Sequence, residues 1–458
     1  MLLDTKLQNC NFLCESSTEI ESVMNRYIQY MYSYPHKTAY GSLENINLND
    51  YFYHLEGGGH SLYLHLPFCE SKCGYCDLFS VTGFNKISID HYIESVINQI
   101  KQYKQYLPQN TVFQDFIIGG GTPLLLTDEQ LLRVFEMVKT YMPLSKDCKI
   151  IIETAPNQTT KENVALLKKV GVTRVSLGIQ SFYDMELRQL QRNHCREQAL
   201  QAATLLSESH FDCVNFDFIY GIPNQTKEHF LNSLKQAIAF SPNEIYLYPL
   251  YIKHGVKLVN ASQKNNLDLE NTYRLYQYGS AYLKENGYTQ RSMRCFLKKT
   301  EENQNQCRSS FSECGFKSTL SLGCGGRTYL GRLHTCTPYK ITRCAALEEI
   351  NNYIQIKDHM IVNHGIILSD EELKRRYVIK HILMIPGISK KAYKKAFDSD
   401  LLVDFPIINE WIKSGWIDET QDFICLSEVG LGLSDYIGPQ LISEEIKAKM
   451  LEWERVNG

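Results

Sequence analysis

Three cysteines lie close together in the sequence, at a spacing that suits an iron–sulfur cluster. Cys69, Cys73 and Cys76 form the pattern C-x3-C-x2-C directly after an apolar run. Three thiolates from one tight loop can hold three irons of a four-iron cubane. The fourth iron then lacks a protein ligand, and an open position on a metal is where a cofactor or substrate can bind.

Two other interpretations of these cysteines are compatible with the residues alone. They could be buried thiols, or they could form a zinc site that His65 completes. Zinc ligands usually come as C-x2-C pairs, two pairs to a site, and this loop has a single pair. The spacing therefore favours a [4Fe–4S] cluster.

A glycine-rich turn follows the next apolar run. Residues 118–123 read Ile-Gly-Gly-Gly-Thr-Pro. Glycines let the backbone approach a ligand closely, and bare carbonyl groups there could accept hydrogen bonds from an amino group. Such a turn on its own is weak evidence for a ligand site.

Polar residues lie at or after the ends of the later apolar runs. They are Glu153, Gln180, Arg192 and Asp217. A guanidinium is suited to a carboxylate, and carboxylates or amides are suited to ribose hydroxyls. Each could instead be an ordinary solvated side chain, and His194 is more simply a surface or packing histidine.

The elements that must position these residues are strands alternating with helices. Apolar runs predict strands at 62–66, 112–118, 149–153, 174–179, 213–219 and 244–248, and helical periodicity predicts helices at 90–106, 128–141, 161–170, 185–207 and 226–240. Thr127 and Thr226 are expected helix N-caps. This alternation indicates parallel strands with right-handed crossovers, in a doubly wound sheet or a barrel. In both, ligands gather at the carboxyl ends of the strands.

The cysteine loop resembles that of the radical S-adenosylmethionine (SAM) superfamily, in which an aromatic residue precedes the third cysteine as Tyr75 does here. The string from Tyr63 to Cys69, Tyr-Leu-His-Leu-Pro-Phe-Cys, is similar to the branch that contains oxygen-independent coproporphyrinogen III dehydrogenases. The resemblance continues from about residue 60 through nearly the whole chain. It implies an α/β fold, a partial (β/α)6 TIM-type barrel, and an enzyme that cleaves SAM reductively to methionine and a 5′-deoxyadenosyl radical.

The resemblance also implies which residues bind SAM. Gly120, Gly121 and Thr122 would line its methionine part, and Glu153 would hold the ammonium group or the ribose. The full expected set is Tyr63, Tyr75, Gly120, Gly121, Thr122, Glu153, Gln180, Arg192 and Asp217. A second SAM molecule, for methyl transfer or carbon–carbon bond formation, is one option within the family.

One position departs from the coproporphyrinogen dehydrogenase pattern. Those enzymes carry another cysteine two residues after the third cluster cysteine, where this chain has Leu78. This difference argues against porphyrinogen oxidation as the activity. It favours an uncharacterised subgroup that is similar to haem-trafficking and unassigned relatives. The glycine-rich stretch 322–329 is shared with those relatives, but the His-Asn…Tyr-Trp sequence of the haem-handling members is not found ahead of it. A haem-binding or trafficking protein, or an anaerobic tetrapyrrole-modifying enzyme, stays the alternative.

The expected domain organisation has four parts. Residues 1–60 form a lead-in that packs on the main domain, and 61–250 form the radical SAM β/α core. The regular alternation stops near residue 251, so 251–365 are expected to cover the open end of the barrel on the substrate side. Residues 366–458 contain helices followed by a terminal hairpin, which predicts a small winged-helix-like domain.

The expected cover is rich in arginine and cysteine. Arg294 and Arg327 are the best candidates to bind carboxylates of a substrate; the others are Arg291, Arg308 and Arg332. The six cysteines there (295, 307, 314, 324, 336 and 344) could hold an auxiliary cluster or donate hydrogen atoms, but their spacing favours inert thiols. Tyr246, Tyr248 and Tyr251 could wall the substrate cavity or pack in the core.

The composition and charge of the chain limit the classes of partner that it could bind. A net charge of -3 argues against nucleic acid, and no apolar run reaches the ~18 residues of a membrane span. The start of the sequence lacks a signal-peptide pattern, so we expect a cytoplasmic protein whose 15 cysteines are thiols or metal ligands. The expected partners are a small-molecule or peptide substrate and a reductase or flavodoxin-type electron donor.

Overall fold

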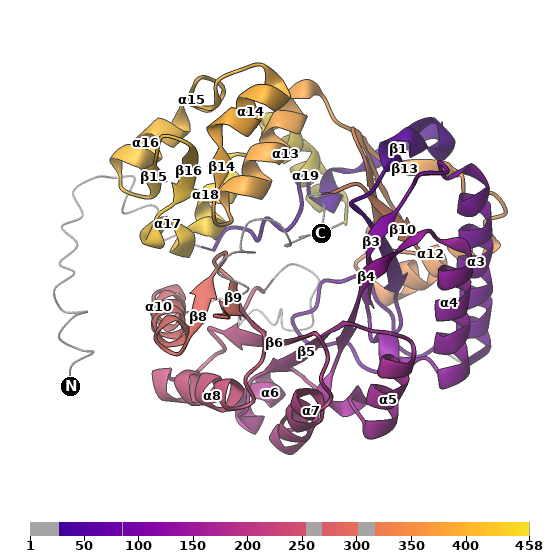
Figure 1. Ribbon diagram of the computed structural model, residues 1–458, viewed down its shortest axis with the longest axis horizontal. Coiled ribbons are helices and arrows are strands. Elements are labelled where there is room, and N and C mark those ends of the chain that lie inside the picture. Colours follow the sequence, from indigo (N-terminus) through magenta and orange to yellow (C-terminus); the bar gives the residue numbers. More distant parts are fainter. Residues whose placement is uncertain (1–26, 85, 253–267, 301–316, 458) are drawn as a thin grey trace.

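Six parallel strands, adjacent to one another in chain order, form the centre of the molecule (Figure 1). The computed structural model describes residues 27–84, 86–252, 268–300 and 317–457. The strands are β2 (His60–Leu66), β3 (Phe113–Gly120), β4 (Leu144–Thr154), β5 (Arg174–Gln180), β6 (Cys213–Tyr220) and β7 (Glu244–Pro249). Their order never reverses, so the sheet is of the barrel type and not doubly wound.

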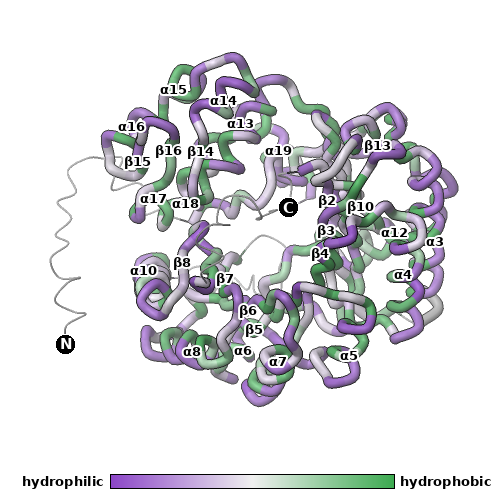
Figure 2. The backbone as a smooth tube through the Cα atoms, in the orientation of Figure 1, coloured by the Kyte–Doolittle hydropathy of each residue, from purple (hydrophilic) through white to green (hydrophobic). Residues whose placement is uncertain are grey.

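Helices cover the outer side of these strands (Figure 1), and polar and apolar residues alternate along them (Figure 2). They are α3 (Lys86–Tyr106), α4 (Asp128–Tyr141), α5 (Lys161–Lys169), α6 (Asp184–Gln189), α7 (Arg196–Glu208) and α8 (Lys227–Ala239). The predicted caps are confirmed, because the hydroxyl oxygens of Thr127 and Thr226 accept hydrogen bonds from the amides of Gln130 and His229.

The prediction of one helix over 185–207 is wrong. The chain leaves α6 through Gln191, whose φ of 54° is left-handed, and α7 starts afresh where the Gln198 side chain accepts a hydrogen bond from the Cys195 amide. Arg192, a candidate site residue, lies in the break between the two helices.

The sheet extends beyond the six strands on both sides and has thirteen strands in the described residues. Next to β2 lies β10 (Thr319–Leu322), which is parallel to it, followed by β11 (Arg327–Leu330), β12 (Leu333–Cys336), β13 (Ile361–Ile367) and β1 (Gly41–Asn47). Beyond β7 lie β9 (Cys295–Lys298) and β8 (Tyr288–Gln290). The edge strands β1 and β8 do not pair with each other within the described chain, so the sheet is a partial barrel.

The N-terminal segment contributes more secondary structure to the fold than the sequence indicated. Its elements are η1 (Lys37–Ala39), β1 and η2 (Leu48–Leu55), and β1 pairs antiparallel with β13. Most β1 side chains are exposed or half-buried, so this edge strand has no clear apolar alternation. Leu48, Phe52 and Leu55 of the lead-in pack in the main hydrophobic cluster with the barrel, whereas Met31, Tyr34 and Tyr40 pack in the hydrophobic cluster of residues 366–446.

The C-terminal part differs from the expected order at two points. The sequence predicts one helix over 402–411, but the chain forms two, α15 (Leu401–Asp404) and α16 (Ile407–Lys413), because Pro406 interrupts it. The predicted hairpin is not terminal, since α17 (Glu428–Gly432), α18 (Ser434–Gln440) and α19 (Glu444–Asn457) follow it. The remaining α-helices and strands of the described residues are α10 (Leu269–Glu285), α12 (Arg343–Gln355), α13 (Asp370–Ile382), α14 (Lys390–Phe397), β14 (Ile388–Ser389), β15 (Ile417–Glu419) and β16 (Phe423–Leu426).

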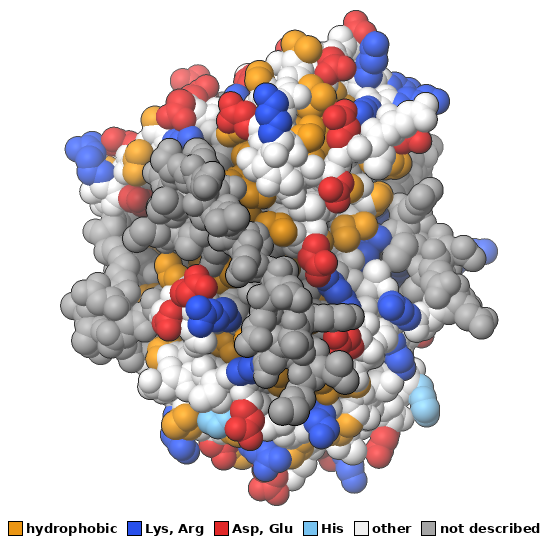
Figure 3. All heavy atoms as spheres, turned by 90° about the vertical axis from the view of Figure 1, so that its left-hand side faces the viewer, with side chains coloured by type: hydrophobic (Ala, Val, Ile, Leu, Met, Phe, Trp, Pro, Cys, Tyr) orange, Lys and Arg blue, Asp and Glu red, His pale blue; other side chains and the backbone are white. Residues whose placement is uncertain are grey.

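The surface carries mixed charge. On the face that Figure 3 shows, acidic and basic side chains are interspersed and form no extended patch of one sign in the coloured residues. Among the described helices, none combines the length and the apolar character that crossing a membrane would require.

Candidate functional site

One cavity of about 630 Å³ lies at the carboxyl ends of the parallel strands, where the topology predicts ligands. We call it the central cavity. The three cysteines and every predicted SAM contact line it: Cys69, Cys73, Cys76, Tyr63, Tyr75, Gly120, Gly121, Thr122, Glu153, Gln180, Arg192 and Asp217. The structure thus brings together residues that are up to 154 positions apart in the sequence, while their binding roles stay predictions.

The cysteine loop is fixed by backbone hydrogen bonds to its surroundings. The Cys69 amide donates to the Val81 carbonyl at 2.9 Å, and the Gly74 amide donates to the Leu190 carbonyl at 3.0 Å. Arg192 Nη1 lies 3.1 Å from Cys73 Sγ. A fixed positive charge therefore stands beside a sulfur that would be negative as a metal ligand.

Burial affects how easily two of the three cysteines ionise. Burial and the neighbouring Cys73 sulfur raise the pKa of Cys76 to about 12, and burial raises the pKa of Cys69. Thiolates in such a crowded, buried group need a compensating positive metal centre. In the described residues, no three His, Cys, Asp or Glu side chains converge as ligands of a single ion. A cubane has no such requirement, because each cysteine binds a different iron.

The structure does not support His65 as the fourth ligand of a zinc site. The His65 ring is engaged by the protein through both nitrogens: Nε2 lies 2.8 Å from the Phe79 carbonyl oxygen and Nδ1 lies 3.2 Å from the Tyr63 hydroxyl. Burial lowers the pKa of His65 to about 4. His65 is therefore a packed, hydrogen-bonded core residue.

The glycine turn at the end of β3 packs directly against the cysteine loop. The amides of Gly121 and Thr122 donate to the carbonyls of Leu66 and Phe68, each at 2.7 Å. A Cβ on Gly121 would lie 2.3 Å from the Phe68 oxygen. Gly120 has a φ of 113°, which residues with a side chain rarely adopt. Glycine is required here so that the turn can lie beside the loop.

Glu153 and Asp217 place two carboxylates in the cavity. Burial among protein atoms and the nearby Asp217 raise the pKa of Glu153 to about 7, although its side chain remains accessible to water through the cavity. Burial raises the pKa of Asp217 to about 6, against the opposing effect of a hydrogen bond from Asn215 Nδ2 at 2.8 Å. Two carboxylates that are costly to ionise together suit a cationic ligand such as SAM, which carries an ammonium and a sulfonium group.

Gln180 and Arg192 complete this wall. Gln180 has a left-handed φ of 67° at the end of β5, a conformation that costs a non-glycine residue about 1–3 kcal/mol and that concentrates at functional sites. Arg192 Nη2 donates to the Gly178 carbonyl at 2.9 Å, and its buried Nε has no hydrogen-bond partner in the described structure. A Cβ on Gly178 would lie 2.8 Å from Gln180 Nε2, so this glycine gives the amide its space.

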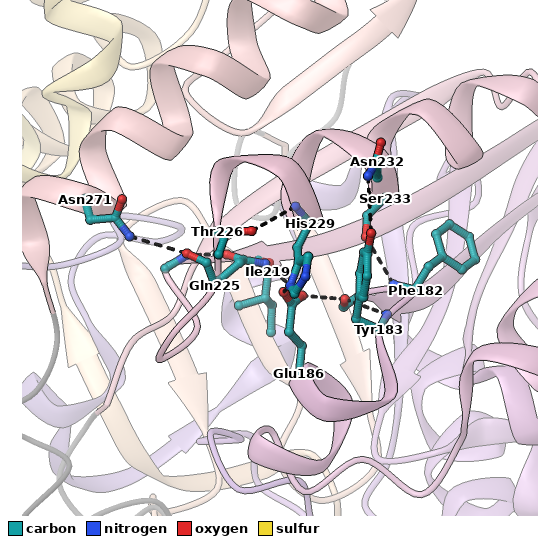
Figure 4. A network of polar contacts seen from close by, with 12 residues as sticks. Phe182, Tyr183, Glu186, Ile219, Gln225, Thr226, His229, Asn232, Ser233 and Asn271 are labelled. Atoms are coloured by element: carbon teal, nitrogen blue, oxygen red, sulfur yellow. Dashed lines mark hydrogen bonds and ion pairs between the residues drawn. The ribbon is translucent and has the colours of Figure 1, made fainter.

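A buried polar network behind Gln180 was missed by the sequence analysis (Figure 4). Glu186 is fully buried and accepts hydrogen bonds from Ser181 Oγ at 2.5 Å and from Gln225 Nε2 at 3.0 Å. His229 Nδ1 lies 3.3 Å from its second oxygen. Because Gln225 also accepts from the Gly221 amide at 2.9 Å, the network ties the loop after β5 to the loop after β6.

The two arginines predicted to bind substrate have different environments. Arg327, at the start of β11, lines the central cavity. Arg294 is not among the lining residues: its Nη2 lies 2.5 Å from Asp435 and 2.8 Å from the Tyr251 hydroxyl, and both charged side chains are at most 5% exposed. A desolvated guanidinium needs such a partner. The expectation of a substrate contact at Arg294 is therefore wrong, because Asp435 already occupies it.

The other residues of the expected cover also lie in different environments. Tyr248 and Tyr251 line the cavity, whereas Tyr246 does not and stacks on Tyr248. Cys295 and Cys324 are buried thiols, Cys344 is exposed, and Cys336 lines the cavity. Outside the described residues lie Cys307, Cys314 and Arg308.

Further cavity residues were not predicted as site residues. Among them are Tyr30, Tyr32 and Lys37 from the N-terminal segment and Tyr339 from the loop after β12. The aromatic, basic composition of residues 27–40 was the available signal, but nothing in the sequence indicates that this segment reaches the cavity.

Comparisons with known proteins agree with this geometry. Residues 63–237 match the model of the radical SAM superfamily. The haem chaperone HemW of Haemophilus influenzae is 30% identical over 299 residues, which cover 64% of this chain and 76% of that protein. HemW of Bacillus subtilis is 25% identical over 397 residues, 84% of this chain and 99% of that protein. Coproporphyrinogen III oxidase (HemN) of Escherichia coli has a similar structure, with a TM-score of 0.76 and 20% identity over 90% of this chain and 98% of that one.

Proposed function

Because this chain belongs to the radical SAM superfamily, among its HemW-like and HemN-like members, and therefore has a [4Fe–4S] cluster and SAM as cofactors, we propose that it is an enzyme that cleaves SAM reductively. The products are methionine and a 5′-deoxyadenosyl radical, which takes a hydrogen atom from a substrate. The observation that carries the proposal is the convergence of the cysteine loop, the β3 glycine turn and the polar strand ends on one cavity.

In this proposal the residues of the chain hold the cluster and position SAM. Cys69, Cys73 and Cys76 hold the cluster, which when bound supplies one electron to the SAM sulfonium and so breaks its bond to the 5′ carbon. The β3 turn and Glu153 hold the ammonium end of SAM, with backbone carbonyls and a carboxylate as acceptors. These contacts would hold SAM in a fixed orientation beside the cysteine loop, and such positioning is where a protein contributes most to a reaction of this kind.

Arg192 has two tasks in this proposal. Its Nη1 lies 3.1 Å from Cys73 Sγ and 3.5 Å from the Tyr75 hydroxyl, and Arg192 lines the cavity. It supplies positive charge both to the thiolate side of the cluster and to the carboxylate of SAM. In this proposal Gln180 and Asp217 bind the ribose hydroxyls.

The test is single-turnover chemistry under anaerobic conditions. Protein reconstituted with iron and sulfide is mixed with SAM and dithionite, and 5′-deoxyadenosine is quantified by mass spectrometry. We expect its release by the wild-type protein and none by a Cys69→Ala/Cys73→Ala/Cys76→Ala protein. Wild-type protein that carries a full cluster and binds SAM but releases no 5′-deoxyadenosine would refute the proposed function.

Haem handling is the second candidate, because the named relatives are haem chaperones. The same reconstituted protein is therefore incubated with haem and passed over a desalting column. Haem that co-elutes stoichiometrically, without 5′-deoxyadenosine formation, would favour a carrier. Release of 5′-deoxyadenosine without haem retention favours the enzyme. The electron donor expected in the cell is of the flavodoxin or reductase type, and the cytoplasmic location stays a prediction.

A further inference from the structure

Several tyrosines line the central cavity, and a phenol has a particular reactivity where a carbon radical forms. The O–H bond of a phenol is weaker than the C–H bond that a 5′-deoxyadenosyl radical makes when it takes a hydrogen atom. Transfer of hydrogen from a phenol to this radical is therefore favourable. A tyrosine beside the 5′ carbon of SAM competes with the substrate for the radical, or replaces the substrate when none is bound.

Tyr248 lies on the strand next to the proposed ribose contact. It belongs to β7 and pairs in register with Ile219 of β6, two residues after Asp217. Side chains two residues apart on a strand face the same side of the sheet, and Asp217, Ile219 and Tyr248 all line the cavity. Asp217 is proposed to bind the ribose hydroxyls, and the ribose carries the 5′ carbon. Tyr248 is therefore a neighbour of the site where the radical forms.

Two other aromatic rings hold the ring of Tyr248 in place. The Tyr246 ring stacks on it with centroids 5.9 Å apart, and the Tyr30 ring meets it edge-on at 6.2 Å. Tyr246 is 9% exposed, so the stack rests on the packed interior. Such ring pairs have a preferred geometry, and a fixed position of the reacting group is what an atom transfer requires.

The hydroxyl of Tyr248 differs from those of two other cavity tyrosines. The Tyr251 hydroxyl donates to Asp435, and the Tyr339 hydroxyl donates to the Asp77 carbonyl at 2.9 Å. Their hydrogens are thus directed to protein acceptors. Within the described residues, the Tyr248 hydroxyl donates no hydrogen bond. Burial holds its pKa well above the usual range and the nearby Asp217 raises this pKa further, so the phenol keeps its hydrogen at neutral pH.

We propose that Tyr248 donates its hydroxyl hydrogen atom to the 5′-deoxyadenosyl radical when no substrate is bound. The inference rests on the proposed function, because reductive cleavage of SAM supplies the radical. The O–H bond of Tyr248 breaks and a C–H bond forms at the 5′ carbon, which gives 5′-deoxyadenosine and a neutral tyrosyl radical. One electron from the flavodoxin- or reductase-type donor and one proton from water then restore the phenol. Tyr248 thus protects the protein from a radical that has no substrate.

Single-turnover SAM cleavage in heavy water, without a substrate, tests this transfer. Hydrogen on a phenol oxygen exchanges with the solvent, whereas hydrogen on carbon does not. The reconstituted full-length protein is equilibrated in heavy water and mixed with SAM and dithionite, and 5′-deoxyadenosine is analysed by mass spectrometry. We expect one deuterium on the 5′ methyl group from the wild-type protein. We expect loss of this label in Tyr248→Phe, which keeps the ring contacts but lacks the hydroxyl.

Tyr273→Phe is the matched control. Tyr273 is also half-buried and stacks on a tyrosine, Tyr276, with ring centroids 6.1 Å apart, but it does not line the cavity. Its 5′-deoxyadenosine should carry the same label as that of the wild-type protein. A second measurement does not depend on any variant: freeze-quenched wild-type protein should show a radical whose electron paramagnetic resonance spectrum narrows when ring-deuterated tyrosine is incorporated.

Three results would overturn the inference. They are unlabelled 5′-deoxyadenosine from the wild-type protein, equal labelling in Tyr248→Phe, and a radical spectrum that ring deuteration leaves unchanged, as for a thiol donor such as Cys336. Should Tyr248→Phe fail to fold, the label and the spectrum of the wild-type protein decide. Unlabelled 5′-deoxyadenosine refutes this inference alone, whereas the absence of 5′-deoxyadenosine refutes the proposed function and the inference with it.

Discussion

Glu153 and Asp217 face the same cavity, and their ionisation depends on what enters it. Without SAM, burial and mutual repulsion hold the pKa of Glu153 near 7. Because this pKa is raised above that of the unfolded chain, the contribution of Glu153 to stability is present at low pH and is lost as pH rises through about 7. A cationic ligand reverses this preference, since it favours the carboxylate.

SAM binding should therefore strengthen as the pH rises from 6 to 7.5. Below its pKa, each pH unit can change the affinity by up to about tenfold if one carboxylate must lose its proton. Glu153→Gln should flatten this dependence and weaken binding at pH 7.5. Isothermal titration calorimetry at several pH values, in buffers of different ionisation enthalpy, measures both the affinity and the released proton.

The control for this experiment is Glu129→Gln, which neutralises an exposed carboxylate on α4. Its pH profile should match that of the wild-type protein. A Glu153→Gln protein with an unchanged profile would show that this carboxylate does not face bound SAM.

Arg192 gives the second prediction at the residue scale. Loss of a charge-assisted hydrogen bond to the SAM carboxylate in Arg192→Ala should cost about 1.5–3 kcal/mol of binding free energy. Arg188→Ala, an exposed arginine on α6, serves as the control. Iron content must be measured in parallel, because Arg192 also contacts Cys73. Unchanged SAM affinity with a full cluster would count against this placement.

At the scale of elements, the loops after β5 and β6 depend on one buried carboxylate. Glu186→Ala would leave Ser181 and Gln225 without their shared acceptor and would remove the carboxylate beside His229, and an unsatisfied buried polar group costs about 1–3 kcal/mol. We expect a lower melting temperature and weaker SAM binding, because Gln180 precedes Ser181 directly. Glu197→Ala on the exposed side of α7 is the control, and both are compared by thermal denaturation and calorimetry.

Equal melting temperatures for Glu186→Ala and Glu197→Ala would contradict the role of the network. Lower stability with unchanged SAM affinity would show that Glu186 stabilises the fold but does not affect SAM binding through Gln180.

The core elements could be predicted because each carries its own local signal. Buried parallel strands are short apolar runs, and Thr127 followed by Gln130 marks a helix start. The break between α6 and α7 could not be predicted, because no residue type in the sequence marks the left-handed conformation of Gln191. The role of Glu186 could not be predicted either, because an acidic residue in the first turn of a helix is usually solvated.

At the scale of the whole molecule, a buried ion pair joins the C-terminal helices to the barrel. Asp435 of α18 pairs with Arg294 beside β9, and the Arg294 guanidinium carbon lies 3.8 Å from the centroid of the Tyr30 ring. The Tyr251 hydroxyl also donates to Asp435. One contact therefore connects the N-terminal segment, the end of the barrel and the C-terminal helices.

Breaking this pair on one side should be more harmful than removing both charges. Asp435→Leu leaves a buried guanidinium uncompensated, which costs about 3–5 kcal/mol, whereas the Asp435→Leu/Arg294→Met double variant removes both. We expect a lower melting temperature for the single variant than for the double variant. The reverse order would show that the pair itself supplies net stability.

This connection also explains what the sequence analysis could and could not predict about the site. The cysteine loop and the strand ends were predictable because chain order places them at one sheet edge. Lys37 and Asp435 were not, since their positions depend on contacts between segments that are separated by hundreds of residues. Arg294 shows the consequence, because an arginine that fits a substrate role by composition is held by the C-terminal helices.

Electron paramagnetic resonance of the dithionite-reduced protein, recorded with and without SAM, tests whether one cavity holds a [4Fe–4S] cluster with an open iron next to SAM. We expect one four-iron cluster per chain whose spectrum changes when SAM is added, and neither cluster nor spectrum in the triple cysteine-to-alanine protein. A four-iron cluster that persists in the triple variant, or a wild-type spectrum that SAM leaves unchanged, would contradict it.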